Sequence, residues 1–238
     1  IQIIDDKILK PIGFGYYLPV LETDFEMYIH RNDDLDDSNL GPFLADAIHY
    51  YVNNHSQTKT DISLIAHGVI RDKFKIGKEG IQIASDIFRI VSLGDGEDGI
   101  PGYPLAQVFL TGKELKSMFE MLLIAPKLSE SNHCYYAGVK IYYNSDKGFF
   151  RKIQKIEING NEIDFSRKND KLYGLVANSY MLEFVGMIKS MTFGLVSVKP
   201  KDKNGNKITD NKTTWINFAQ DSNDFIEGKE WMAVLKYI

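Results

Sequence analysis

The apolar residues between Leu40 and Asn53 constrain the fold of this chain more than any other feature of its sequence. They fall at offsets 0, 3, 4, 7, 8, 11 and 12 from Leu40, which makes a single stripe at helical spacing. Ser38 or Asn39 can cap such a helix, and Pro42 is tolerated because first-turn amides have no partner within a helix. The pattern therefore predicts an amphipathic helix over this range.

A second helix is predicted at TGKELKSMFEMLL, where Thr111 and Glu114 have the spacing of a capping box. Its expected buried face is Leu115, Met118, Phe119, Leu122 and Leu123. Three short apolar segments between the two helices predict mostly buried strands. The three segments are DISLIAH (61–67), FRIVSL (88–93) and PLAQVFL (104–110). Before the first helix, apolar and polar residues alternate in FEMYIHR (25–31), which predicts one more strand.

From residue 134 the pattern changes to longer strands. CYYAGVKIYYN (134–144), FRKIQKIEI (150–158) and LYGLVAN (172–178) read as strands, and Asn159-Gly160 is a hairpin signal. A helix over 179–191, a strand over 193–200 and a closing helix over 222–238 follow. No repeat or linker interrupts the chain, so we expect one α+β domain spanning residues 1–238.

The composition fits a stable domain and excludes several classes of function. An apolar fraction of 44% in 238 residues can supply a core. The 28 basic and 32 acidic residues argue against nucleic-acid binding, which needs a basic face. The single cysteine, Cys134, excludes an internal disulfide, and no apolar stretch approaches the roughly 20 residues of a membrane span. Because the chain begins abruptly with strand-like residues, we expect a further segment upstream.

The sequence carries no recognisable catalytic metal motif. None of the five histidines lies in an HExxH or D-x-H context. The acidic run Asp33 to Asp37 could bind Ca²⁺, but it lacks the glycine and the distal glutamate of an EF-hand, which favours a solvated loop. A nucleophilic pair of His133 and Cys134 is disfavoured because adjacent strand residues point to opposite faces.

A glycine-rich stretch, SLGDGEDGIPGYP (92–104), is the most conspicuous irregular segment. Its glycines let the backbone approach a ligand closely or donate amides to an anion. It is not a Walker sequence, and Asp95, Glu97 and Asp98 would repel a phosphate. It is therefore either a shaped connection between strands or one wall of a site.

Four segments in order resemble the C-terminal domain of the 5'-nucleotidase family: SNLGPFLADAI (38–48), ISLIAHGVIRD (62–72), ASDIFRIVSLG (84–94) and VFLTGKELKSMFE (108–120). The resemblance runs roughly from Ile12 to Met191. It implies a layered α/β/β/α sandwich that binds the substrate, while a separate N-terminal metallophosphoesterase domain holds two divalent metal ions and performs hydrolysis. It implies no catalytic residue, metal site or cofactor in this chain, and a periplasmic or secreted location. The charge balance and the lack of a long apolar stretch argue against a nucleic-acid or membrane partner.

The resemblance also implies candidate residues for binding the substrate. Arg71 matches the arginine of the family's N-G-G-G-I-R motif, whose preceding residues are only partly retained here, with His67 and Gly68 among them. Leu93 stands where the family's P-F-G-N motif has its aromatic residue. With Leu93 at that position, one face of the family's base clamp is missing. For the other two candidates the alternatives are that Arg71 braces a turn and that His67 is a hydrogen-bonded structural histidine.

Further candidates lie elsewhere in the chain, both before and after the later strands. The family's second clamp loop, G-G-D-G with an aromatic residue, is replaced by MLEFVGM, which leaves Tyr180 and Phe184 as the nearby aromatic side chains. These two lie four residues apart, so a place in the core is the alternative. Arg89, between two apolar residues, faces either a cleft or solvent. The arginines that the family has before its S-N-L-G helix are replaced by the acidic run, with Arg31 the nearest survivor.

Three functional hypotheses follow. The first is the substrate-recognition domain of a 5'-nucleotidase-like metallophosphoesterase, a hydrolase of nucleotide catabolism, with an altered preference for its nucleotide or other phosphorylated small molecule. The second is a non-catalytic binding or packing module that has lost nucleotide recognition. The third, an independent enzyme using His133 and Cys134, has the least support in the sequence.

Overall fold

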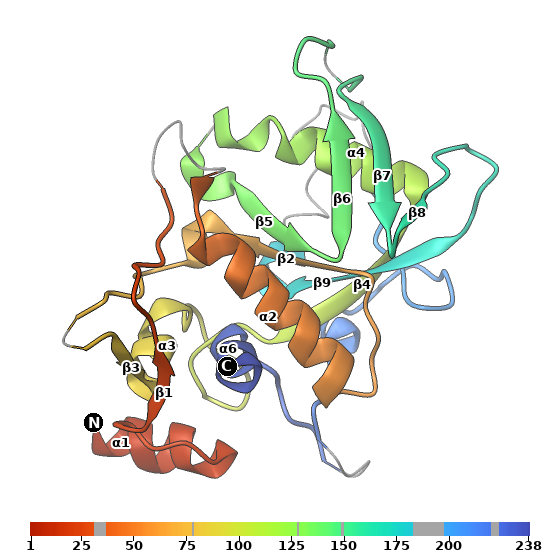
Figure 1. Cartoon of the computed structure of the whole chain (residues 1–238). Helices are drawn as coiled ribbons and strands as arrows, with labels where there is room; N and C mark the ends of the chain where they lie inside the picture. The colour runs from red at the N-terminus through yellow and green to blue at the C-terminus, as the bar shows by residue number, and fades with distance from the viewer. Residues whose placement is uncertain (31–36, 78, 128, 149, 183–197, 220–223) are drawn as a thin grey trace.

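A four-stranded sheet with the strand order β4-β9-β2-β5 lies at the centre of the computed structural model (Figure 1). Its strands are β2 (Ile62–Ala66), β4 (Leu105–Thr111), β5 (Cys134–Ala137) and β9 (Leu172–Asn178). β2 and β9 run parallel, whereas β4 and β5 are antiparallel to their neighbours. The structure describes residues 1–30, 37–77, 79–127, 129–148, 150–182, 198–219 and 224–238.

Alternating side chains of the central sheet divide the interior into two cores. Ile65 of β2 and Val176 of β9 point into the first core, whereas Leu64 and Leu175 point into the second. Successive strand residues face opposite sides, so one strand can fill two cores when both faces are covered. This is why β2 is buried at each of its positions.

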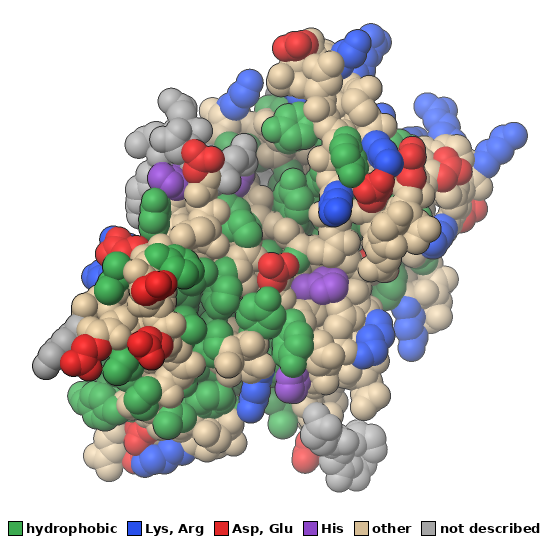
Figure 2. Space-filling view, in the orientation of Figure 1, with side chains coloured by type: hydrophobic (Ala, Val, Ile, Leu, Met, Phe, Trp, Pro, Cys, Tyr) green, Lys and Arg blue, Asp and Glu red, His purple; other side chains and the backbone are tan. Residues whose placement is uncertain are grey.

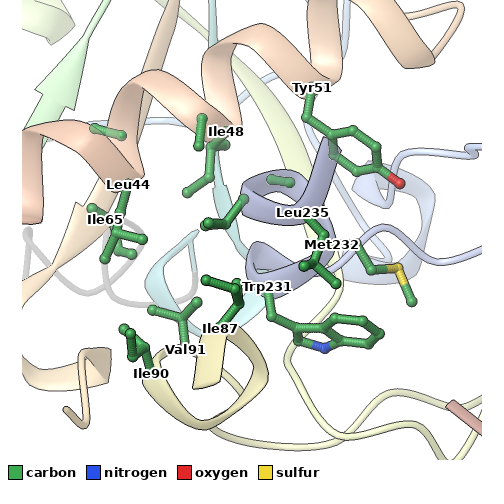
Figure 3. Close-up of a cluster of buried hydrophobic side chains, with 14 of the residues drawn as sticks. Leu44, Ile48, Tyr51, Ile65, Ile87, Ile90, Val91, Trp231, Met232 and Leu235 are labelled. Carbon is green, nitrogen blue, oxygen red and sulfur yellow. The ribbon is translucent and has the colours of Figure 1, made fainter. Parts of the chain in front are cut away.

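Three helices cover the first face of the sheet: α2 (Leu40–His55), α3 (Ala84–Ile90) and α6 (Glu230–Tyr237). Figure 3 shows Ile48 and Tyr51 of α2 facing Met232 and Leu235 of α6, with Trp231 beneath them. Trp231 is fully buried. Each such side chain stabilises the fold by roughly 1.5–3 kcal/mol through removal of apolar surface from water.

The second face is covered by α4 (Gly112–Leu122) and by a three-stranded sheet of β6 (Val139–Tyr143), β7 (Ile153–Ile158) and β8 (Asn161–Glu162). The predicted capping box of α4 is present, because Thr111 Oγ1 accepts the Glu114 amide at 3.3 Å and Glu114 Oε2 accepts the Thr111 amide at 2.9 Å. The helix and sheet layers that the resemblance implies are therefore present, and the α+β fold class is confirmed.

Smaller elements complete the described chain. The N-terminal segment has α1 (Gln2–Ile4), a π-helical turn (Asp5–Leu9) and a 3-10 turn (Lys10–Ile12), and β1 (Pro19–Glu22) pairs with β3 (Ile81–Ile83). Figure 2 shows hydrophobic side chains gathered over this part of the surface, and the exposed ones include Ile3 and Tyr17. Further 3-10 turns lie at His67–Val69, Ala125–Lys127, Glu130–Asn132 and Asn211–Thr214.

Several predicted elements are confirmed. Both amphipathic helices and the strands at 61–67, 104–110, 150–158 and 172–178 are present, with small shifts of their ends. The hairpin turn is confirmed as well, since Asn159 and Gly160 have φ of 51° and 75°. The predicted helix over 179–191 is described only as far as residue 182, and most of the predicted strand over 193–200 lies outside the described residues.

Other predictions are wrong. Residues 88–90 belong to α3 rather than to a strand, because Ile87 and Ile90 both turn into the first core at helical spacing and Asp86 Oδ2 accepts the Ile83 amide at 3.0 Å. Residues 25–30 form a single bridge, Met27 to Phe74, rather than a strand. The predicted strand over 134–144 breaks into β5 and β6 at Gly138, whose φ is 80°. The closing helix begins only at Glu230.

The first turn of α2 differs from the predicted cap. Asn39 occupies the N-cap position without a side-chain cap bond. Instead, Asn39 Oδ1 accepts the Tyr28 amide and Ser38 Oγ accepts the His30 amide, both at 2.7 Å. The two polar side chains therefore tie the segment 28–30 to the helix.

Gly41 in this first turn is required by packing rather than by its backbone angle. A Cβ at Gly41 would overlap the ring of Tyr135 from β5. The absence of a side chain therefore lets the tyrosine ring lie flat against α2.

We expect Gly41→Ala to destabilise the protein although alanine favours helices by about 1 kcal/mol over glycine. Displacing a well-packed ring costs about 1–3 kcal/mol, so the free energy of unfolding should fall by about 1 kcal/mol in equilibrium urea denaturation. Gly148→Ala is the control, because nothing lies within 4 Å of a Cβ there. Equal stability of the two variants would contradict this account of Gly41.

Candidate functional site

Three segments that are distant in sequence meet at one edge of the central sheet. β2 and β9 are parallel, so their carboxyl ends lie together, and β4 begins at the same edge because Leu105 pairs with Asn178. The residues at this edge are therefore 67–71 after β2, 93–104 before β4, and 178–182 at the end of β9. We call these residues the β2–β9 edge. Ligand sites commonly lie outside the carboxyl ends of parallel strands.

Backbone hydrogen bonds join these segments. The Arg71 amide donates to the Ile90 carbonyl at 2.8 Å, and the Tyr103 amide donates to the Leu93 carbonyl at 3.1 Å. The Ser179 amide donates to the Pro104 carbonyl at 2.8 Å. These bonds tie the three segments to one another, the first of them through the end of α3, with Arg71 in the first segment and Tyr180 in the last.

Arg71, the predicted anion partner, is exposed at this edge. Among the described residues no carboxylate forms an ion pair with it. Three cavities, with volumes of about 730, 760 and 1000 Å³, have linings that do not include Arg71. The binding role of Arg71 stays a prediction.

Arg89 is also exposed, but its charge is already balanced. Its guanidinium pairs with Asp72 and, at 3.3 Å, with Asp86. Two carboxylates compete with any anionic ligand for the same donors. Of the two predicted arginines, Arg71 is thus the better placed to receive a phosphate.

His67 and Gly68 lie where β2 ends. His67 is 4% exposed, and its Nδ1 lies 3.2 Å from the Tyr135 hydroxyl, which donates to Ser38 Oγ at 2.9 Å. Gly68 is tightly packed, since a Cβ there would lie 3.0 Å from Ser131. These contacts brace the turn that leads to Arg71.

Leu93 is half-buried and packs against the first core, so it has the position of a filler rather than of a stacking platform. Phe184 lies outside the described residues. Tyr180, by contrast, is 54% exposed, which rules out the alternative that it belongs to the core.

Tyr180 stacks on Tyr103, with ring centroids 5.4 Å apart and an interplanar angle of 15°. The Tyr103 ring also lies on Gly94, because a Cβ at Gly94 would overlap that ring and Gly94 has φ of 82°. The sequence reasoning missed Tyr103 as a site residue. Its place directly after Gly102, at the end of the glycine-rich segment, is the signal that could have indicated it.

The remaining chemistry of the described residues is limited. Burial raises the pKa of the Cys134 thiol to about 12, so the thiol stays protonated and is a poor nucleophile. Among the described residues no group of three or more His, Cys, Asp or Glu side chains could hold a metal ion. No described helix has the length and apolar character needed to cross a membrane.

Glu230 is the most perturbed acid near the β2–β9 edge. It is 3% exposed, and burial raises its pKa to about 8, although a hydrogen bond from Asn178 acts in the opposite direction. At neutral pH this carboxyl group is therefore mostly protonated and uncharged.

With this geometry established, comparison with known proteins identifies the family. Residues 19–189 match the family model "5'-nucleotidase, C-terminal domain". Because the match covers more than half of the chain, the chain belongs to this family. No curated protein matches the chain at a significant level.

Solved structures show the same fold at low sequence identity. The 5'-nucleotidase precursor of Thermus thermophilus has a TM-score of 0.55 at 13% identity, with 92% of this chain and 36% of that chain covered. The NAD nucleotidase of Haemophilus influenzae has a TM-score of 0.52 at 16% identity, with coverage of 94% and 34%. A sulfate thiohydrolase of Thermus thermophilus has a TM-score of 0.53 at 10% identity, with coverage of 93% and 32%. The chain thus spans about a third of each of these relatives.

We expect the stability of the protein to fall as pH rises from about 4.5 to about 8 because of Glu230. Its folded pKa is raised, so the folded state holds the proton more tightly; the stabilisation is complete below about 4.5 and is lost as pH passes about 8. The loss from this group is on the order of 4 kcal/mol.

Urea denaturation of the protein and of Glu230→Gln across this pH range checks the prediction. Glutamine cannot ionise, so the difference in free energy of unfolding between the two proteins should change with pH in the stated direction. A pH-independent difference would show that Glu230 does not titrate in this way.

Proposed function

We propose that this chain is the substrate-recognition domain of a 5'-nucleotidase-like metallophosphoesterase. It binds a nucleotide or a related phosphorylated small molecule at the β2–β9 edge. Family membership supports this assignment, and two of the similar structures are a 5'-nucleotidase precursor and an NAD nucleotidase by name.

The observation that carries the proposal is that the β2–β9 edge has both an exposed tyrosine stack and an exposed arginine. Tyr180 offers an exposed ring face, and aromatic stacking holds a nucleobase by roughly 1–3 kcal/mol. Arg71 offers a guanidinium without a carboxylate partner among the described residues, which suits the forked binding of a phosphate. A nucleotide has a base that can stack on the ring and a phosphate that can bind the guanidinium.

The closed tyrosine stack indicates an altered mode of base recognition. A base held between two parallel rings needs roughly 7 Å between them, because each contact takes about 3.5 Å. The observed centroid distance of 5.4 Å leaves no such space between Tyr103 and Tyr180. In our proposal the base therefore stacks on the outer face of Tyr180 alone, and base selectivity is weak.

Hydrolysis is assigned to another part of the polypeptide. The relatives are about three times longer than the matched region, and their names describe hydrolases. In our proposal an N-terminal metallophosphoesterase domain holds two divalent metal ions, as the resemblance implies, and this chain presents the phosphate to them. A periplasmic or secreted location is part of the same proposal.

The test of ligand binding is calorimetric titration of the chain with AMP. Tyr180→Ala should weaken binding about 5- to 150-fold through loss of stacking, and Arg71→Ala about tenfold or more through loss of charge-assisted hydrogen bonds. Tyr142→Ala and Arg151→Ala are matched controls, because both residues are exposed on the β6–β7 hairpin away from the edge.

The same titration tests the rival function, a packing module without nucleotide recognition. The filler position of Leu93 and the neutralised Arg89 favour that rival. No heat of binding with AMP, adenosine or a UDP-sugar would reject our proposal in its favour, and equal losses in the control variants would reject the assigned positions.

A further prediction concerns catalysis. The chain alone should release no phosphate from AMP, with or without added Mn²⁺, because its described residues supply no dinuclear metal site. Phosphate release is measured colorimetrically, with a characterised 5'-nucleotidase as the positive control. Metal-dependent turnover by the isolated chain would overturn the division of labour between the two domains.

A further inference from the structure

Ionisable side chains that are buried concentrate in one short segment, residues 227–231, at the start of α6. Glu227, Lys229 and Glu230 are 5%, 0% and 3% exposed. Burying a polar or charged group costs free energy unless it is hydrogen-bonded or paired, and an apolar segment would fill the same space at lower cost. The partners of these side chains therefore indicate what the segment does.

Two of the residues hold the glycine-rich part of the edge. Lys229 Nζ pairs with Glu227 and, at 3.2 Å, with Asp98 Oδ1, and Glu227 Oε1 accepts the Glu97 amide at 3.0 Å. Trp231 Nε1 donates to the Pro101 carbonyl at 2.8 Å. The stretch that leads into Tyr103 is thus fixed to α6 at several points.

Glu230 holds the other part of the edge. Its Oε1 accepts a hydrogen bond from Asn178 Nδ2 at 3.0 Å, and Asn178 Oδ1 accepts the Met181 amide at 2.8 Å. The bond to Glu230 fixes which way the buried Asn178 amide points. That orientation presents Oδ1 to the turn that carries Tyr180.

We propose that residues 227–231 form a positioning element that holds both rings of the Tyr103–Tyr180 stack, with Glu230 acting through Asn178 on Tyr180. Lys229, Glu227 and Trp231 set the position of Tyr103, and Glu230 sets that of Tyr180. The stacked geometry results from both attachments. The effect on ligand binding rests on the proposed function, whereas the positioning of the tyrosines does not.

The first test uses no ligand. Glu230→Leu keeps the side-chain volume approximately and removes the acceptor, so the Met181 amide should exchange with deuterium at least tenfold faster in native-state hydrogen-exchange NMR. The conservative variant Glu230→Gln, which retains an acceptor oxygen, should restore slow exchange. Met232→Leu is the control for a packing change in the same helix, and amides of α2 report global stability.

The positioning role would be overturned if the Met181 amide exchanged at an unchanged rate in Glu230→Leu. It would also be overturned if exchange accelerated equally at Met181 and at the amides of α2. If Glu230→Leu does not fold, Glu230→Met takes its place, because its unbranched side chain adapts to irregular space. The same outcomes apply to that variant.

The second test is a double-mutant cycle on AMP affinity with Glu230→Leu and Tyr180→Ala. Glu230→Leu should weaken binding about tenfold in the native background and less than twofold when Tyr180 is already alanine, because it acts through that ring. Additive losses would overturn the route through Tyr180. If the unsubstituted chain does not bind AMP while Met181 exchange responds as expected, the proposed function fails and the positioning element stands.

Discussion

The parallel pairing of β2 with β9 is the interaction on which the rest of the structure depends. It places strands from the two halves of the chain side by side, and Asp61 Oδ2 reinforces the pair by accepting the Gly174 amide, 113 residues away, at 2.7 Å. Because the two strands run parallel and end at the same edge, the turns that carry Arg71 and Tyr180 both leave the sheet at that edge. The two cores on either side of the sheet then fix this arrangement.

The sequence predicted the parts of the fold whose signal is local. The stripe from Leu40 and the capping box at Thr111 need only spacing and short-range hydrogen bonds, and both are present. The strand predicted for residues 88–90 is wrong because a short apolar run fits a buried helix equally well, and only tertiary packing decides between them. The pairing order of the strands depends on contacts between distant residues, which one sequence does not reveal.

The candidate site was predictable in part for the same reason. Arg71 follows a buried strand and matches a family motif, so its exposure at a strand end could be expected. Tyr103 matches no such motif, and its role emerges only from stacking on Tyr180 across the edge. The partners of Lys229 and Glu230 were equally hidden, because sequence patterns do not show that charged residues near a helix start are buried. Ligand contact stays a prediction for each of the candidate residues, which are Arg71, His67, Gly68, Arg89, Leu93, Tyr180 and Phe184.

The strand order also has a consequence for how the chain folds. β2, near residue 65, has β5 and β9 as its neighbours, so it lacks one hydrogen-bonding partner until residues up to Asn178 have been synthesised. Such long-range pairing gives a high contact order, which slows folding. During translation the apolar strand β2 would therefore lack its partner β9 until most of the chain has been made. In that interval the nascent chain is most exposed to aggregation or to capture by a chaperone.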